Sequence, residues 1–168
     1  MKPIYEFKDN ILIIADPDLN INLTSDLPMK KQILYYDDKK ILAELHYHKN
    51  SLHGSSIYYS KDHDVLSSSW FYLGKRYGRT YQYYLSKKPY SVLCYNEDLM
   101  DGMQTYYYEN GQIKTLMNYK KGTLHGEVKL FYEDSKMKRF LIFDNGKKTQ
   151  DNIFDENEVL VDEKKFEL

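Results

Sequence analysis

The chain has 168 residues, with 24 Lys and Arg against 25 Asp and Glu, and its formal net charge is -1. This length fits one domain, and a hydrophobic content of 42% is typical of soluble globular proteins and not of disordered chains. A nearly neutral chain has no long-range field that would gather phosphates, so the composition disfavours nucleic acid as the main partner. The single cysteine, Cys94, excludes an internal disulfide framework and a cysteine-based zinc site.

No segment of the sequence is typical of a cleaved leader or a membrane anchor. The apolar run near the N-terminus, Ile11 to Ala15, is too short for the core of a signal peptide and follows Glu6 and Asp9. No apolar stretch reaches the length that a transmembrane helix needs. The sequence therefore predicts a cytoplasmic protein, although export by a specialised secretion system, whose signals need no apolar core, stays open.

The first part of the chain, residues 1–29, lies outside the regular repeat and is predicted to form an N-terminal capping hairpin. Its expected strands are Ile4 to Phe7 and Ile11 to Ala15, with a turn between them. Asp16-Pro17-Asp18 should end the second strand, because proline has no N–H to donate and aspartate favours turns. Asn20 to Leu23 alternates polar and apolar residues and is expected to pair with the first repeat.

Residues 30–150 contain five units that repeat every 24 residues without a gap. A period of this size marks stacked supersecondary units. One column of the repeat consists of glycines and two columns consist of aromatic residues. The glycines are Gly54, Gly78, Gly102 and Gly126, and the aromatic columns are Tyr35, Tyr59, Tyr83, Tyr107 and Phe131, and Tyr47, Phe71, Tyr95, Tyr119 and Phe143.

Each unit is predicted to contain two short strands separated by turn residues. In the fourth unit the expected strands are Gln104 to Tyr108 and Ile113 to Tyr119, joined through Asn110-Gly111, because Asn-Gly is a strong hairpin signal. No unit carries apolar residues at helical spacing. The sequence therefore predicts an all-β fold: an elongated single antiparallel sheet of tandem 24-residue β-hairpin repeats. A C-terminal capping hairpin over residues 151–168, with Ile153 to Phe154 and Val159 to Val161 as strands, should cover the last edge.

The columns themselves are predicted to be structural. The glycine that closes each unit should mark a tight corner or a residue with positive φ, where a Cβ would clash. The aromatic rings should pack against their cross-strand neighbours. A two-residue hairpin loop would place the two aromatic columns on opposite faces, and a three-residue loop would place them on the same face. The sequence does not decide between these loops.

The fourth unit resembles the MORN repeat, and more closely its bacterial variant. Tyr107-Tyr108-Glu109-Asn110-Gly111, Tyr119-Lys120-Lys121-Gly122 and His125-Gly126 match the family pattern, while the fifth unit is recognisable and the first three are degenerate. The resemblance covers Lys30 to Lys148 and implies hairpins stacked into one long antiparallel sheet. It also implies a module without catalytic activity of its own that binds proteins or membranes. Many bacterial variants carry an antitoxin label.

Several polar side chains are of the types that bind metals or act in catalysis. His46 and His48 lie two apart on a predicted strand with His53 nearby, but no carboxylate or thiol at a defined spacing completes a zinc site. His63 falls in a hairpin loop, where a solvated side chain is expected. Ser67 to Ser69 lack the glycines of a nucleophile elbow, and no phosphate-binding glycine motif occurs. We therefore predict no catalytic residue, no metal site and no cofactor.

Partner binding is predicted in the second and third units, which depart most from the repeat pattern. The candidate contacts are aromatic and arginine side chains, which often anchor interfaces: Trp70, Tyr72, Arg76, Tyr77, Arg79, Tyr81 and Tyr90. Sequence drift in degenerate repeats would produce the same departures. The preferred function is a non-enzymatic scaffold that binds another protein through a sheet face or edge. The alternatives are a membrane-surface module that binds lipid headgroups and an antitoxin-like protein that neutralises its partner.

Overall fold

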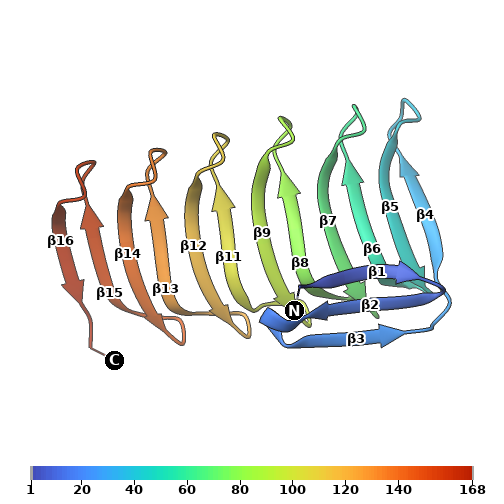
Figure 1. Ribbon diagram of the computed structural model, residues 1–168, viewed down its shortest axis with the longest axis horizontal. Coiled ribbons are helices and arrows are strands. Elements are labelled where there is room, and N and C mark those ends of the chain that lie inside the picture. Colours follow the sequence, from blue (N-terminus) through green and yellow to red (C-terminus); the bar gives the residue numbers. More distant parts are fainter. Residues whose placement is uncertain (1, 168) are drawn as a thin grey trace.

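The computed structural model describes residues 2–167 and contains two antiparallel β-sheets (Figure 1). The N-terminal sheet has the strand order β1-β2-β3, and the repeat sheet has 13 strands that follow chain order from β4 to β16, with the short β10 paired to β9. Within residues 2–167 the one helical element is a 3-10 turn, η1 (Pro17–Leu19), and no helix is long and apolar enough to cross a membrane. The prediction of an all-β fold with a long antiparallel sheet is confirmed.

Apart from the two-residue β10, the strands have between five and nine residues. Those of the N-terminal sheet are β1 (Ile4–Lys8), β2 (Ile11–Asp16) and β3 (Ile21–Ser25). Those of the repeat sheet are β4 (Lys30–Tyr35), β5 (Ile41–His48), β6 (Ser51–Tyr59), β7 (Val65–Tyr72), β8 (Lys75–Tyr83), β9 (Pro89–Asn96), β10 (Leu99–Met100), β11 (Gly102–Tyr107), β12 (Ile113–Lys120), β13 (Thr123–Phe131), β14 (Met137–Asp144), β15 (Lys147–Phe154) and β16 (Leu160–Lys165). The predicted C-terminal hairpin corresponds to β15 and β16.

Each repeat hairpin closes through a loop of three residues. In the fourth unit Tyr108 N donates to Gln112 O at 2.8 Å, and Gly111 N donates to Tyr108 O at 2.9 Å. A β-bulge between Tyr106 and Tyr107 shifts the register next to this loop. The bulge reverses the parity that a three-residue loop alone would give, so the two aromatic columns lie on opposite faces of the sheet.

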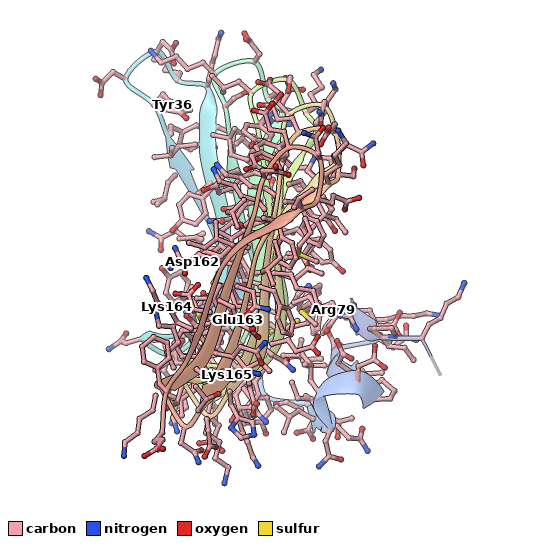
Figure 2. The ribbon with its side chains drawn as sticks, turned by 90° about the vertical axis from the view of Figure 1, so that its left-hand side faces the viewer. Tyr36, Arg79, Asp162, Glu163, Lys164 and Lys165 are labelled. Carbon is pink, nitrogen blue, oxygen red and sulfur yellow. The ribbon has the colours of Figure 1, made fainter. Side chains whose placement is uncertain are left out.

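The N-terminal sheet lies across one face of the repeat sheet, with its strands crossing those of the repeats (Figures 1 and 2). Leu12 and Ile14 of β2 and Ile21 of β3 are its buried core. The side chains of β2 are apolar from Ile11 to Ala15, and every second one is buried because alternate side chains of a strand point to the same face. The predicted hairpin forms as β1 and β2, but its expected place at the end of the repeat sheet is wrong in two respects. Strand β3 pairs with β2 and not with the first repeat, and β4 remains an edge strand among the residues that the structure describes.

The glycine column allows this close approach of the two sheets. Gly78 has φ +75°, and a Cβ built there would lie 2.3 Å from Cε1 of Tyr5. Gly102 has φ +87°, and its Cβ would lie 2.8 Å from Cδ2 of Leu19. All four repeat glycines have positive φ, as predicted. We call the face that carries the N-terminal sheet the docking face.

Candidate functional site

Arg76 and Arg79 flank Gly78 but point to opposite faces of the repeat sheet. Arg79 reaches into the N-terminal sheet, where its Nε lies 2.8 Å from Oδ2 of Asp16. Arg76 stacks over the ring of Tyr95 with its Cζ 4.0 Å from the ring centroid, and its Nε lies 3.1 Å from Oδ1 of Asp98. The two arginines, predicted as neighbours in one binding region, therefore do not form one site.

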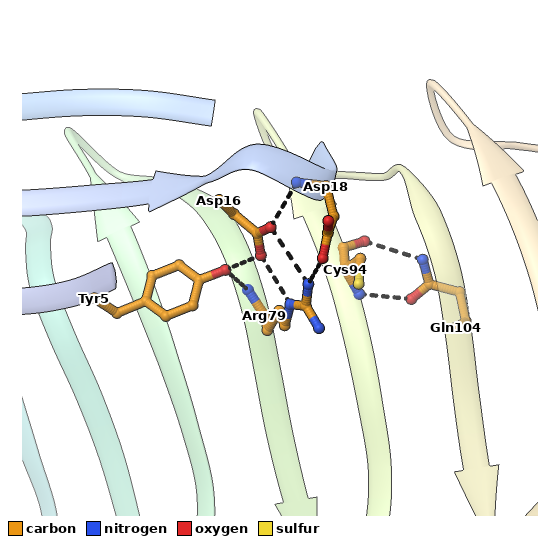
Figure 3. Close-up of polar contacts among 6 residues, drawn as sticks. All are labelled: Tyr5, Asp16, Asp18, Arg79, Cys94 and Gln104. Atoms are coloured by element: carbon orange, nitrogen blue, oxygen red, sulfur yellow. Dashed lines mark hydrogen bonds and ion pairs between the residues drawn. The ribbon is translucent and has the colours of Figure 1, made fainter. Parts of the chain in front are cut away.

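Tyr5, Asp16, Asp18 and Arg79 form the Arg79 cluster, which joins the two sheets (Figure 3). Nη2 of Arg79 lies 3.3 Å from Oδ1 of Asp16 and 2.6 Å from Oδ2 of Asp18. The Tyr5 hydroxyl donates to Oδ2 of Asp16 and accepts from the main-chain N of Arg79 at 3.2 Å. Asp16 also accepts from Asp18 N at 3.1 Å, as the N-cap of η1.

The protonation states in the cluster follow from these contacts. Burial alone would raise the pKa of Asp16, but hydrogen bonds from Arg79 and Tyr5 and the charge of Arg79 outweigh it and hold the pKa below its ordinary value. Burial and the bond to Asp16 raise the pKa of Tyr5, and the bond to Asp16 raises the pKa of Arg79. Tyr5 is thus a neutral phenol, Asp16 a carboxylate and Arg79 a guanidinium, and each is a hydrogen-bond partner of another. This arrangement is typical of a structural ion pair.

Gln104 holds the neighbouring strands together beside this cluster (Figure 3). Its fully buried side chain accepts from Cys94 N at 2.9 Å and donates to Cys94 O at 3.1 Å, where β10 interrupts the pairing of β9 with β11. Burial raises the pKa of the Cys94 thiol to about 11. Cys94 is therefore a neutral, packed thiol at physiological pH and not an activated nucleophile.

The structure separates the seven predicted contact residues into two groups. Trp70, Tyr72 and Tyr77 pack against the core of the N-terminal sheet, so three rings expected on a free surface are covered by the chain itself. Tyr81 lies on the same face, two residues beyond Arg79 on β8. Tyr90 lies on the opposite face, with its ring 5.9 Å from that of Tyr106. Contact of the seven predicted side chains with a partner stays a prediction.

The candidate histidines form hydrogen bonds or ring contacts within the protein. His53 is fully buried, with Nε2 3.1 Å from the Ser25 hydroxyl, and its Nδ1 accepts from Leu73 N at 3.1 Å. Nδ1 of His48 lies 2.9 Å from Pro28 O. In the described part of the chain, no three His, Cys, Asp or Glu side chains come close enough to hold a metal ion. The His63 ring stacks on Tyr59 in its loop, at 4.7 Å between centroids.

Beside the Arg79 cluster the docking face is hollowed into a shallow depression of about 500 Å³. Its lining includes Leu19, Tyr81, Val92, Met103, Thr105 and Tyr107. Beyond this depression the N-terminal sheet no longer covers the repeats, as Figure 1 shows for β12 to β16. The docking face is therefore part covered and part open.

Comparison with family models identifies two segments, residues 100–121 and 124–145, that match the MORN repeat variant. These two segments are MORN repeats of the variant type. The matched segments cover the end of the third unit, the fourth unit and most of the fifth, where the sequence follows the repeat pattern best. No curated protein matches the chain significantly.

A second tyrosine column, which was not predicted from the sequence, links successive hairpins of the repeat sheet. Each hydroxyl donates to a main-chain carbonyl of the next hairpin: Tyr36 to Tyr59 at 2.8 Å, Tyr84 to Tyr107 at 2.7 Å, Tyr108 to Phe131 at 2.8 Å and Tyr132 to Phe154 at 3.1 Å. The signal was present in the sequence, because these tyrosines follow the same 24-residue step with one interruption at Ser60. The column fixes the spacing of the hairpins at their loop ends.

Proposed function

We propose that this MORN-repeat protein is a non-enzymatic scaffold that binds a protein partner on the docking face. One observation supports the proposal above the others. The docking face already holds β-structure, the N-terminal sheet, through apolar packing and the buried Arg79–Asp16 ion pair, and the same face continues uncovered over the later repeats. A surface that binds one β-element in this way is suited to a second.

The uncovered part carries a row of half-buried side chains that crosses the strands. The register pairs Val92 with Thr105, Thr105 with Leu116, Leu116 with Lys129 and Lys129 with Phe140, so all five share one face. The row is mostly apolar and contains one lysine. Contiguous apolar area with few charges is typical of the centre of protein interfaces.

Two leucines on adjacent strands, Leu116 on β12 of the fourth repeat and Leu130 on β13 of the fifth, provide a matched test of the face. Leu116 lies in the row on the docking face, whereas Leu130 pairs with Thr115 and lies on the opposite face, and both are half-buried. The partner is first identified by affinity purification with the wild-type chain. Leu116→Lys should then lower its affinity at least tenfold, and Leu130→Lys should leave it within about twofold. Equal effects of the two substitutions, or a larger effect at Leu130, would contradict the proposal.

Lipid headgroups are the competing class of ligand, and the charge distribution disfavours them. Lysines at the turns pair with acidic neighbours, at 3.8 Å for Lys61 and Asp38, 3.0 Å for Lys75 and Glu97, and 2.8 Å for Lys87 and Asp64. Such pairs reduce the attraction to an anionic membrane. Co-sedimentation with vesicles that contain phosphatidylserine should therefore leave the protein in the supernatant at physiological ionic strength.

A further inference from the structure

We propose that the outer edge of β1 binds an extended segment of a partner protein, which adds a fourth strand to the N-terminal sheet and lies on the docking face. The inference rests on the proposed function and specifies where the partner attaches and in what conformation. Extended segments commonly bind in this way, through main-chain hydrogen bonds to an exposed edge and alternate side chains in pockets.

The register shows which main-chain groups β1 offers. Strands β1 and β2 join through Asp9 and Asn10, with φ of 52° and 62°, which is a two-residue turn of type I′. Lys8 and Ile11 are therefore the hydrogen-bonded pair that closes the turn. Because such pairs alternate along an antiparallel ladder, the N–H and C=O groups of Tyr5 and Phe7 point away from β2. Strand β1 has no neighbour on that side among the described strands.

The position next to β1 lies above the docking face. Tyr5 reaches Gly78 and Arg79, and β1 is the strand of the N-terminal sheet nearest to the repeat hairpin loops (Figure 1). Adjacent strands are about 4.8 Å apart, and two residues along a repeat strand advance about 6.7 Å. A fourth strand would consequently lie over Tyr81, two residues beyond Arg79. The register places Ile57 and Ser68 in the same row as Tyr81.

A fourth strand beside β1 would cover apolar side chains that are now exposed or half-buried. Phe7 shares the inward face of β1 with Tyr5, because the two lie two residues apart. It is nevertheless 44% exposed. Ile57 and Tyr81, in the row beneath the proposed strand, are half-buried. A segment with apolar residues at alternate positions would cover Phe7 and contact this row, while its other side chains would face solvent beside Glu6 and Lys8.

The geometry favours a single extended segment over a folded domain or a second copy of the chain. Strands β5 to β9 continue past the row toward their hairpin loops, so the space beside β1 is bounded below by the repeat sheet (Figure 1). Pairing of β1 with β1 of a second copy would bring two repeat sheets into the same space. A segment one strand thick avoids this clash.

The two edges of the repeat sheet are less suited to strand addition. Strand β16 carries four consecutive charged residues, Asp162, Glu163, Lys164 and Lys165 (Figure 2). They form ion pairs two residues apart, at 3.0 Å for Lys164 and Asp162 and 3.5 Å for Lys165 and Glu163. Charged side chains are a usual protection of edge strands. At the other end β4 begins with Lys30 and Lys31, whose side chains are also charged.

A defined peptide tests the edge directly. The probe is acetyl-Lys-Thr-Val-Thr-Val-Thr-Val-Lys-amide, whose valines would face the docking face and whose valine N–H groups would bond to β1. A matched peptide with N-methylated valines keeps the side chains but cannot form these bonds. With the full chain labelled with ¹⁵N, the probe should shift the amide signals of Tyr5, Phe7 and Tyr81, and the N-methylated peptide should shift none of them. No shift with the probe, equal shifts with both peptides, or shifts on β4 or β16 would overturn the proposal.

Two substitutions of Phe7 distinguish the contribution of its main-chain N–H to probe binding from that of its ring. Phe7→Pro removes an N–H that β2 does not use, whereas Phe7→Ala keeps this N–H and removes only the ring. We expect Phe7→Pro to weaken probe binding at least tenfold and Phe7→Ala to weaken it less, with the remaining amide spectrum unchanged in both. Probe binding by Phe7→Pro at wild-type affinity would overturn the proposal.

The same variants distinguish this inference from the proposed function when the purified partner is used. Loss of affinity on both Leu116→Lys and Phe7→Pro supports the two together. Loss on Leu116→Lys alone overturns strand addition at β1 and leaves the scaffold proposal standing. Wild-type affinity in both variants overturns both.

Discussion

Arg79 of β8 and Asp16 of β2 form a two-point ion pair between the two sheets, with Nε 2.8 Å from Oδ2 and Nη2 3.3 Å from Oδ1. The Asp16 side chain is 0% exposed and that of Arg79 is 25% exposed. The pair is thus largely removed from water, and the Tyr5 hydroxyl and Asp18 N complete the bonding of the carboxylate. It anchors the N-terminal sheet on the docking face.

Arg79→Met should detach or strongly destabilise the N-terminal sheet. Removing one partner of a buried ion pair leaves an uncompensated charge and typically costs about 3–5 kcal/mol. Trp70, the single tryptophan, packs against the core of this sheet, so its fluorescence during urea unfolding reports the loss.

Arg76→Met is the matched control, since Arg76 pairs with Asp98 on the opposite face and both side chains are more than a third exposed. Exposed pairs contribute about 0–1 kcal/mol. A cost for Arg79→Met no larger than that for Arg76→Met would contradict the assigned role of Arg79.

Acid should weaken the attachment of the N-terminal sheet. The folded-state pKa of Asp16 lies below its ordinary value, so the stabilisation is present above the unfolded-state pKa, about 3.9, and is lost as pH falls through the folded-state pKa. The free energy of unfolding, measured by urea titration between pH 6 and pH 2, should fall below about pH 4. Asp16→Asn should make the fall of the unfolding free energy with acid less steep. Part of the fall should remain in this variant, because Arg139 and Lys148 hold the pKa of Asp151 well below its usual range and Asp151 therefore also stabilises the fold less in acid.

Gly78→Ala should destabilise the chain more than Gly111→Ala. Both glycines have positive φ, at 75° and 93°, so each alanine incurs a backbone penalty of about 1–2 kcal/mol. Only at Gly78 would the new Cβ also collide, at 2.3 Å from Cε1 of Tyr5, whereas nothing lies within 4 Å at Gly111. Thermal melts of the two variants, side by side, measure the difference. Equal melting temperatures would show that the close approach of Tyr5 to Gly78 is unimportant.

Tyr108→Phe should cost about 1 kcal/mol, the usual net contribution of one hydrogen bond, because its hydroxyl donates to Phe131 O in the next repeat at 2.8 Å. Tyr107→Phe is the control, because it removes a hydroxyl from the neighbouring tyrosine, which belongs to the first aromatic column and not to the second tyrosine column. Urea unfolding should place Tyr107→Phe closer to the wild type. The reverse order would contradict the role of the second tyrosine column.

The repeat sheet could be predicted because its information is local and periodic. The strands of the fourth unit begin and end within two residues of the predicted limits, and all four column glycines have the predicted positive φ. Yet Asn110-Gly111 is not needed for its loop. Lys39, His63, Lys87 and Ser135 adopt the same left-handed conformation in the other hairpins. The stacking of hairpins therefore imposes the turn even where the residue does not favour it.

The site was harder to predict because it depends on contacts between distant segments. Arg79 and Asp16 are 63 residues apart, and no periodicity links β2 to β8. Without knowledge of that contact, Trp70, Tyr72 and Tyr77 are only departures from the repeat pattern, and they suggest a free binding surface. In the structure these three rings instead pack against the core of the N-terminal sheet.

Photo-crosslinking from the two faces of two neighbouring strands, β12 and β13, tests the central claim most directly. Benzoylphenylalanine is introduced in place of Leu116 on the docking face or of Leu130 on the opposite face, and the folded proteins are irradiated in cells. The account predicts a discrete protein adduct from position 116 and none from position 130. An adduct from position 130 alone, equal adducts from both, or no protein adduct from either would contradict it.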